Sequence, residues 1–205
     1  MSLKNKKILV TGGAGFIGSN LVNRLIDEGH EVVVIDNESS DCHDNFYWNE
    51  KAENYKYDIC EYDKIFPLFK GVDTVFHIAA QARIQICIQN PTTAAKTNVY
   101  GTSCVLQAAK ENGVRRLVYS STSSAYGLAN TPPLVETMPK DCLNPYSVTK
   151  VSGEELCQMY TKLFGFETVI FRYFNVYGEN QPLKGQYAPV VGIFQRQLDA
   201  GIPMT

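Results

Sequence analysis

The stretch NPYSVTK, residues 144–150, places a tyrosine and a lysine four residues apart. Asn144 suits a helix N-cap and Pro145 the first turn, so Tyr146 and Lys150 are expected one above the other on a single helical face. Most such pairs are solvated surface pairs. The alternative is a phenol that acts as a base, whose pKa must fall by about 3 units, or about 4 kcal/mol. The lysine ammonium and the positive helix end favour that fall.

A second candidate for chemistry is TGGAGFIG, residues 11–18, which follows an apolar run and opens a helical pattern. Its glycines satisfy G-x-G-x-x-G, which in this context lets a backbone approach a pyrophosphate at a helix N-terminus. A plain strand-to-helix turn is the alternative. Asp36 ends the next apolar run, 18 residues after Gly18, where a carboxylate binds a ribose diol and repels a 2′-phosphate. The pattern therefore predicts a site for NAD rather than NADP, and an oxidised nicotinamide would further favour a phenolate.

Three more loops carry polar or small residues after apolar runs. Asp58 is placed to accept from an adenine amino group, and the small residues of HIAA, residues 77–80, let a cofactor lie close. We interpret His77 as a packed, hydrogen-bonded histidine rather than a ligand or base. Residues 121–124 are four successive hydroxyl side chains after Ser120, which is also the pattern of an ordinary polar loop.

The elements that position these groups alternate between short apolar runs and longer helical segments. We expect strands at Lys7–Val10, Glu31–Ile35, Tyr55–Tyr57, Thr74–Ile78, Arg116–Ser120 and Thr168–Arg172. We expect helices at about Phe16–Glu28 and Tyr62–Phe69, from Asn90-Pro91 to Gly113, and from Asn144-Pro145 to about Gly165. This order predicts an α/β fold with a doubly wound parallel sheet, a Rossmann fold, whose ligands bind at the carboxyl ends of the strands.

Composition sets limits on the function. The chain has 205 residues, 44% hydrophobic and 20% charged, with a net charge of -2. These values give no electrostatic reason to expect nucleic acid or a membrane as a partner. No apolar run approaches the ~18 residues of a membrane span. The apolar stretch at the N-terminus is too short for a signal peptide. We therefore expect a cytoplasmic protein.

The cysteines do not indicate a metal site. The six cysteines include no C-x-x-C pair and match no zinc spacing. We expect buried or half-buried thiols. Asp41, His43 and Asp44 are interpreted as solvated loop residues rather than metal ligands.

The motifs TGGAGFIG, Asp36, HIAA, SST, YSVTK and RYFNVYG occur in this order. Together they resemble the extended short-chain dehydrogenase/reductase family, and within it the nucleotide-sugar 4-epimerases of the UDP-glucose 4-epimerase type. The resemblance implies bound NAD, a UDP-sugar substrate and a homodimer. It implies that Tyr146 is the base, that Lys150 orients the nicotinamide ribose and lowers the Tyr146 pKa, and that Thr122 bridges the sugar oxygen and Tyr146.

The same resemblance and the loops above assign the remaining site residues. Those expected to bind the cofactor are Gly12, Gly15, Phe16, Ile17, Gly18, Asp36, Asn37, Asp58, Ile59, Ala79, Ala80, Gln81, Asn98, Ser120, Tyr146, Lys150, Tyr173 and Phe174. Those expected to bind the substrate are Arg83, Thr122, Ser123, Ser124 and Asn175.

The loop after Thr122 separates related activities. Sugar 4,6-dehydratases and nucleotide-sugar decarboxylases carry an acidic residue there, whereas this chain has Ser123 and Ser124. The resemblance therefore implies a redox-neutral 4-epimerase, in which Tyr146 takes the 4-hydroxyl proton while hydride moves to NAD⁺ and later returns to the opposite face.

Two other activities stay open. A net sugar dehydrogenase or reductase would use dissociable NAD(H), and an inactive NAD-binding fragment would bind NAD without turnover. The family continues past the point that corresponds to Thr205 into a lobe that grips the nucleotide. We therefore expect residues 1–205 to be the NAD-binding domain with its catalytic pair, without most of the substrate lobe.

Overall fold

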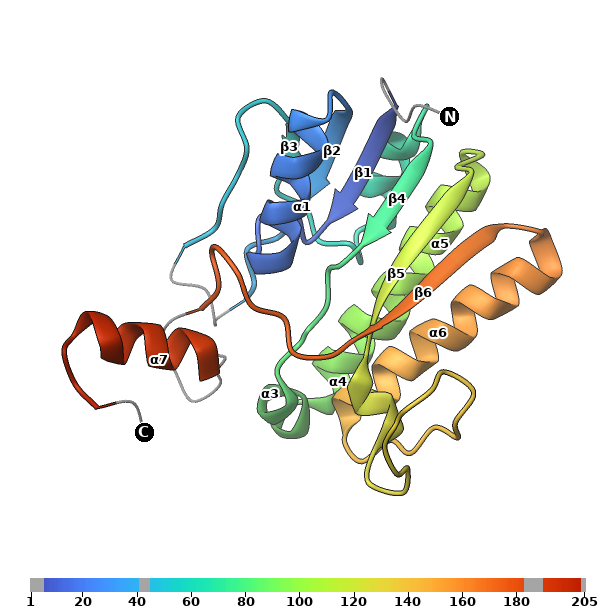
Figure 1. Ribbon diagram of the computed structural model, residues 1–205. Helices are drawn as coiled ribbons and strands as arrows, with labels where there is room; N and C mark the ends of the chain where they lie inside the picture. Colours follow the sequence, from blue (N-terminus) through green and yellow to red (C-terminus); the bar gives the residue numbers. More distant parts are fainter. Residues whose placement is uncertain (1–5, 41–44, 183–189, 204–205) are drawn as a thin grey trace.

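A single parallel sheet organises the chain, seen in a computed structural model that describes residues 6–40, 45–182 and 190–203. Its six strands run in the order β3-β2-β1-β4-β5-β6, and every neighbouring pair is parallel (Figure 1). The strands are β1 (Lys7–Thr11), β2 (Glu31–Ile35), β3 (Glu53–Tyr55), β4 (Thr74–His77), β5 (Arg116–Thr122) and β6 (Glu167–Tyr173). The order reverses between β1 and β4, so the predicted doubly wound α/β fold is confirmed.

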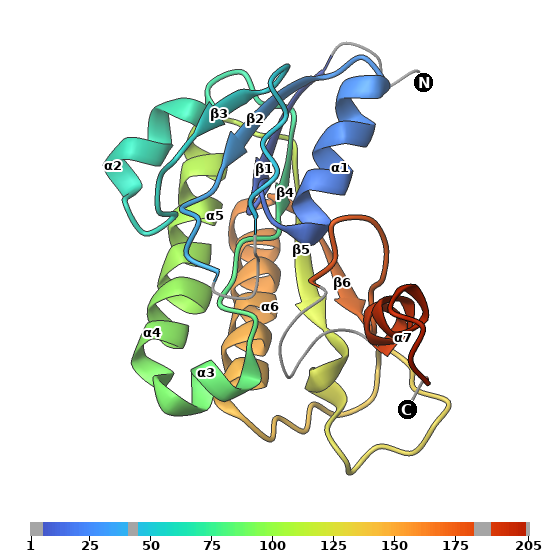
Figure 2. The same ribbon diagram turned by 90° about the vertical axis from the view of Figure 1, so that its left-hand side faces the viewer.

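Helices cover the two faces of this sheet unequally. On one face lies α1 (Phe16–Asp27), and α7 (Val190–Asp199) stands beyond it on the same side (Figures 1 and 2). The opposite face carries α2 (Tyr62–Ile65), η1 (Phe66–Phe69), α4 (Pro91–Ala95), η2 (Lys96–Gly101), α5 (Thr102–Glu111) and α6 (Pro145–Phe164). Two short helices, α3 (Ile84–Gln89) and η3 (Ser123–Tyr126), follow β4 and β5.

The core forms two layers because successive strand side chains point to opposite faces. In β1, Leu9 joins the larger cluster beneath α5 and α6, whereas Ile8 and Val10 join the smaller cluster beneath α1. All three are nearly fully buried, and burying such a side chain contributes roughly 1.5–3 kcal/mol. Continuous apolar runs such as ILV and VVVI therefore form strands that are covered on both faces.

Helix α6 begins where its sequence predicts. The Asn144 side chain accepts from the Ser147 backbone N–H at 2.9 Å, and the Ser147 hydroxyl lies 3.3 Å from the Asn144 N–H, which completes a capping box. Pro145 occupies the first turn, and the helix ends at Gly165 in the left-handed region. This cap fixes the first turn of the helix that carries Tyr146.

Glycine lets the middle of α6 approach β5 closely. A Cβ at Gly153 would lie 2.1 Å from the Tyr119 Oη, well inside any real contact. The Tyr119 hydroxyl instead donates to the Lys150 backbone oxygen at 3.1 Å. The helix axis can therefore lie close enough to the sheet for Lys150 to reach the strand ends.

A buried ion pair fastens the next turn of α6 to the sheet. Glu154, 1% exposed, accepts from Arg172 of β6 at 2.9 and 2.8 Å and from the Ser121 hydroxyl of β5 at 2.6 Å. Burial raises the pKa of Glu154, but the hydrogen bonds from Arg172 and Ser121 and the charges of Arg172 and Lys140 together outweigh it and hold that pKa below its usual value. Arg172 also stacks over the Tyr126 ring, with 4.9 Å to the centroid. The pair thus joins β5, β6 and α6.

Several predicted bounds differ from the structure. The third strand is Glu53–Tyr55, not Tyr55–Tyr57, because pairing with β2 rather than side-chain type decides which residues join the sheet. The helix predicted from Asn90-Pro91 to Gly113 is divided into α4, the π-helical η2 and α5. Pro67 changes the second helix to a 3-10 turn after Ile65. The sequence did not predict three of the observed helices, which are α3, η3 and α7.

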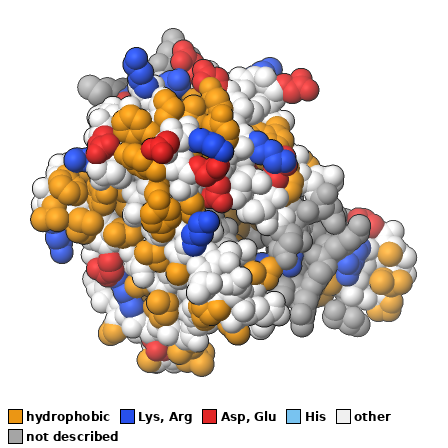
Figure 3. Space-filling model, turned by 180° about the vertical axis from the view of Figure 1, so that it is seen from behind, with side chains coloured by type: hydrophobic (Ala, Val, Ile, Leu, Met, Phe, Trp, Pro, Cys, Tyr) orange, Lys and Arg blue, Asp and Glu red, His pale blue; other side chains and the backbone are white. Residues whose placement is uncertain are grey.

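The surface carries both apolar and charged side chains. Seen from behind, hydrophobic side chains are interspersed with charged ones over the α5 and α6 side (Figure 3). On the α1 side, Phe171 of the edge strand β6 is 48% exposed.

Within the described ranges no helix has the length and apolar character to cross a bilayer. The five described cysteines are free and buried or half-buried, as expected, and Cys42 lies outside the described residues.

Removing the buried carboxylate tests the anchoring of α6. Glu154→Ala leaves Arg172 without its partner, so we expect a loss of about 3–5 kcal/mol in the free energy of unfolding, measured by urea denaturation. The matched control is Glu155→Ala at the neighbouring residue, whose side chain is 61% exposed and whose removal is expected to change stability by less than about 1 kcal/mol. Equal losses for the two variants would show that the buried pair does not anchor the helix.

Candidate functional site

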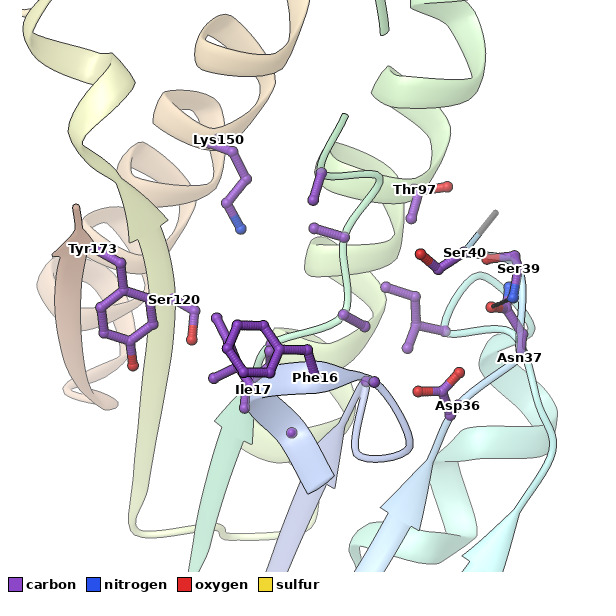
Figure 4. A pocket seen from close by; sticks show the side chains of 18 of the residues that line it. Phe16, Ile17, Asp36, Asn37, Ser39, Ser40, Thr97, Ser120, Lys150 and Tyr173 are labelled. Carbon is purple, nitrogen blue, oxygen red and sulfur yellow. Dashed lines mark hydrogen bonds between the residues drawn. The ribbon is translucent and has the colours of Figure 1, made fainter. Parts of the chain in front are cut away.

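A cavity of about 340 Å³ opens at the carboxyl ends of β1, β2, β4 and β5, as expected for this fold. Figure 4 shows Asp36 and Asn37 at one end, Lys150 and Ser120 at the other, and Phe16 and Ile17 between them. The cavity is thus elongated between the two groups that the sequence assigned to a ribose and to the chemistry.

Most of the predicted cofactor residues line this cavity. They are Gly12, Gly15, Phe16, Ile17, Gly18, Asp36, Asn37, Ile59, Ala79, Ala80, Ser120, Tyr146, Lys150, Tyr173 and Phe174, and Thr122 joins them. Further lining residues that sequence reasoning missed are Ile35, Ser39, Ser40, Phe46, Tyr57, Ile78, Ala82, Thr97, Ser121, Val176 and Pro182. Most of these follow strand ends, so their position after each apolar run was the available signal.

The other predicted residues lie outside the cavity lining. Asp58 accepts from the Asn37 side chain at 3.2 Å, which places it behind a lining residue. Gln81 and Asn98 bond to each other: the Gln81 N–H donates to Asn98 Oδ1 at 2.7 Å, and Asn98 Nδ2 donates to the Gln81 oxygen at 3.0 Å. The predicted substrate residues Arg83, Ser123, Ser124 and Asn175 are likewise absent from the lining.

The glycine-rich segment between β1 and α1, residues 12–15, is called the glycine turn below, and it fits a pyrophosphate. Gly12 has φ +71°, and a Cβ there would lie 2.8 Å from the Ala79 nitrogen. A Cβ at Gly18 would lie 2.0 Å from the Gly12 oxygen. Both positions therefore exclude any side chain, and the start of α1 remains open to a ligand. Gly15 is the N-cap residue of α1 and uses no side chain as a cap, so the first N–H groups face the cavity end of the helix.

Asp36 is held at the end of β2. Its carboxylate accepts from the Ala14 N–H at 3.1 Å and from the Glu38 N–H at 2.8 Å. The side chain therefore links the glycine turn to the loop after β2 while it lines the cavity. A carboxylate fixed at this position suits a ribose diol, and its charge opposes a 2′-phosphate.

Tyr146 and Thr122 meet at the other end. Thr122 Oγ1 accepts from the Ser124 N–H at 3.1 Å, and the interaction of this hydroxyl with the Tyr146 phenol lowers the pKa of the phenol. The pKa of Tyr146 does not follow the expectation from Lys150. Burial raises it, and the Thr122 hydrogen bond is the main effect that lowers it. Desolvation disfavours the phenolate more than the Thr122 hydroxyl favours it.

Lys150 lies in a dry environment. It is 3% exposed, and its Nζ sits 4.3 Å from the centroid of the Tyr119 ring. Burial lowers its pKa to about 7, against smaller opposing effects from Cys157 and Glu154. The ammonium therefore stands over an aromatic face, one helical turn from Tyr146, and lines the cavity.

No metal centre is evident in the part of the chain that the structure describes, where no three His, Cys, Asp or Glu side chains converge. Asp41, His43 and Asp44 lie outside the described residues. His77 is fully buried and hydrogen-bonded through both ring nitrogens, which confirms its interpretation as a packed histidine.

The buried Lys150 predicts a specific pH dependence of stability. The pKa is about 7 when folded against an ordinary 10.5, so above pH 7 the unfolded chain binds more protons and stability rises with pH. Relative to Lys150→Met, the wild-type free energy of unfolding should rise by about 2 kcal/mol between pH 7 and pH 9, measured by urea denaturation. Lys162→Met, at an exposed site on the same helix, is the control. Parallel curves for wild type and Lys150→Met would contradict a buried Lys150 whose pKa is lowered.

Comparisons with known proteins agree with this geometry. A model of the NAD dependent epimerase/dehydratase family matches residues 8–204. UDP-glucose 4-epimerase from Mycolicibacterium smegmatis is 38% identical over 201 residues, which cover 95% of this chain and 64% of that protein. The dTDP-D-glucose 4,6-dehydratase of Mus musculus is 34% identical over 184 residues, which cover 86% of this chain and 52% of that protein.

Solved structures give the same result. The crystal structure of UDP-glucose 4-epimerase with UDP-glucose from Thermotoga maritima has a TM-score of 0.89 at 36% sequence identity, and covers 96% of this chain and 64% of that chain. This chain thus spans less than two thirds of the length of these relatives. The family depends on NAD, which agrees with the glycine turn and Asp36. The chain belongs to the NAD-dependent epimerase/dehydratase family.

Proposed function

We propose that residues 1–205 form the NAD-binding domain of a nucleotide-sugar 4-epimerase that interconverts UDP-glucose and UDP-galactose or the N-acetyl analogues. The observation that carries the proposal is the meeting of Thr122, Tyr146 and Lys150 at one end of the cavity, opposite Asp36. The UDP-glucose 4-epimerases among the relatives support the substrate class.

In the proposed reaction, Tyr146 is the general base. Its phenolate takes the proton from the sugar 4-hydroxyl, and the Thr122 hydroxyl, which lines the same cavity, bridges that oxygen and Tyr146. When bound between Asp36 and Lys150, NAD⁺ would supply the acceptor for hydride from C4 and the donor for its return to the other face. Tyr146 then gives its proton back to the inverted alkoxide, so neither residue nor cofactor is consumed.

The charges around Tyr146 must favour the phenolate before it takes the proton of the sugar 4-hydroxyl. Burial alone raises the pKa of Tyr146, so the base needs positive charge nearby in the working site. Lys150 supplies an ammonium one turn along α6, and the N-terminal end of that helix adds its positive potential. Lys150 also has the position to orient a nicotinamide ribose, because its Nζ points into the cavity (Figure 4).

The loop after Thr122 favours epimerisation over dehydration within this family. Residues 123–127 contain no carboxylate, and η3 holds Ser123 and Ser124 directly after Thr122. Removing water from C5–C6 requires an acid and a base at those carbons, whereas inversion at C4 needs only Tyr146 and hydroxyls. Arg83, Ser123, Ser124 and Asn175 remain our proposed sugar-nucleotide contacts, and the homodimer implied by the resemblance stays a prediction.

Assay of the full gene product that contains this sequence tests the proposal. With UDP-glucose or its N-acetyl analogue and no added cofactor, we expect the 4-epimer to form. Tyr146→Phe should lower kcat by about 10²–10⁴-fold, as expected for loss of a general base. Tyr160→Phe is the matched control, since that phenol donates to the Gln107 side chain of α5 and does not line the cavity.

Each alternative has its own result. A 4-keto-6-deoxy product would show a dehydratase, and stoichiometric release of NADH would show a net dehydrogenase. NAD binding without turnover, unchanged by Tyr146→Phe, would show a binding module. Any of these three results overturns the proposed epimerase.

A further inference from the structure

A line of buried polar groups runs through the interior from the glycine turn to the catalytic helix. Thr11 ends β1, directly before Gly12, and its hydroxyl lies 2.7 Å from His77 Nδ1. His77 Nε2 lies 2.9 Å from the Thr102 hydroxyl, which donates to the Asn98 backbone oxygen at 2.7 Å. Neither His77 nor Thr102 lines the cavity.

The line continues to the first turn of α6. Asn98 Nδ2 donates to the Thr149 hydroxyl at 3.0 Å, and that hydroxyl donates to the Tyr146 backbone oxygen at 2.9 Å. The same amide group bonds both backbone groups of Gln81, in the loop after β4. Five secondary-structure elements, β1, β4, η2, α5 and α6, therefore meet through side-chain hydrogen bonds.

The hydrogen-bond partners of His77 determine its tautomer. Thr102 has one hydroxyl proton, and the Asn98 oxygen receives it, so the His77 Nε2 must carry the ring proton and donate. His77 Nδ1 is then an acceptor, and the Thr11 hydroxyl donates to it. Thr11 Oγ1 is itself an acceptor for the N–H groups of Ile78 and Ala79, at 3.2 and 3.3 Å, and it shares both with the Thr11 backbone oxygen, at 3.2 and 3.1 Å.

A second proton on His77 has no acceptor in this arrangement. At Nδ1 it would face Thr11, whose oxygen already accepts two amide protons. Burial and the charge of Lys150 lower the pKa of His77 to about 3. The other group that faces the ring is the Tyr119 phenol, at 5.7 Å between ring centroids. With His77 in this tautomer, each group in the line donates its proton to the next group, in the direction from β1 toward α6.

We propose that His77, as the neutral Nε2–H tautomer, is a positioning residue that couples the cofactor-binding glycine turn to the placement of Tyr146. At one end, Thr11 holds the loop of Ala79 against Gly12, where both line the cavity. At the other end, Thr149 holds the backbone of Tyr146. Breaking the line in the middle frees both ends, so cofactor affinity depends on hydroxyls that no cofactor touches.

The proposal rests on NAD binding and not on epimerisation, so a chain without 4-epimerase activity still tests it. The first measurement is ¹⁵N NMR of the histidine ring nitrogens, with His77 assigned by comparison with His77→Gln. We expect a protonated Nε2, an unprotonated Nδ1, and no titration between pH 8 and pH 5, about 1.5 units below the ordinary histidine pKa. A proton on Nδ1, or titration in that range, overturns the proposal.

The second measurement is the dissociation constant for NAD, by calorimetry, on the full gene product. Thr102→Val and Thr149→Val each keep the side-chain shape and remove one hydroxyl, so each should weaken NAD binding by about tenfold, the size of one hydrogen bond. Because both break the same line, the double variant should also lose about tenfold rather than a hundredfold.

Controls separate positioning from general loss of stability. Thr102→Ser and Thr149→Ser keep the hydroxyl and should bind NAD within about twofold of wild type, whereas a packing effect would persist in them. Thr161→Val removes a hydroxyl that bonds Cys157 and Thr168 at the far end of α6 and should leave NAD affinity unchanged. Affinities of Thr102→Val and Thr149→Val equal to that of Thr161→Val, or a hundredfold loss in the double variant, would overturn the coupling.

Discussion

Lys150 is buried over the Tyr119 ring of β5, and the placement of α6 depends on keeping it there. A lone ammonium in the interior is unfavourable by several kcal/mol before it is compensated, and its pKa falls accordingly. The compensation comes from the Tyr119 ring beneath it and from the tight packing of its helix. The protein therefore stores an unfavourable charge at the point where a cofactor and a substrate would share the site.

Three features of α6 make that burial possible. The capping box at Asn144 fixes where the helix begins, and Gly153 lets it approach β5 to the distance of the Tyr119 hydroxyl. One turn beyond Lys150, Glu154 binds Arg172 in the neighbouring strand. Each acts on a different turn of the helix, so Tyr146 and Lys150 are held by backbone geometry rather than by their own side-chain contacts.

The sequence was sufficient for those parts of the site that depend on local chemistry. The Asn144-Pro145 start, the glycine turn and Asp36 after an apolar run each have a short-range cause, and all appear where predicted. The Glu154–Arg172 pair joins residues 18 apart through sheet and helix packing, and no spacing indicated it. The line through His77 and Thr102 likewise depends on which strands become neighbours. The direction of the Tyr146 pKa was wrong because sequence shows the nearby lysine but not the burial of the phenol.

In the proposed epimerase, one bound NAD would accept hydride from C4 and return it to the same carbon. The most direct measurement gives the full gene product UDP-glucose, or its N-acetyl analogue, deuterated at C4, with unlabelled NAD⁺ in solution. Mass spectrometry should find the 4-epimer with deuterium retained at C4 and none in the free cofactor. Deuterium in free NADH or in solvent, or accumulation of a 4-keto product, would contradict the proposed epimerase.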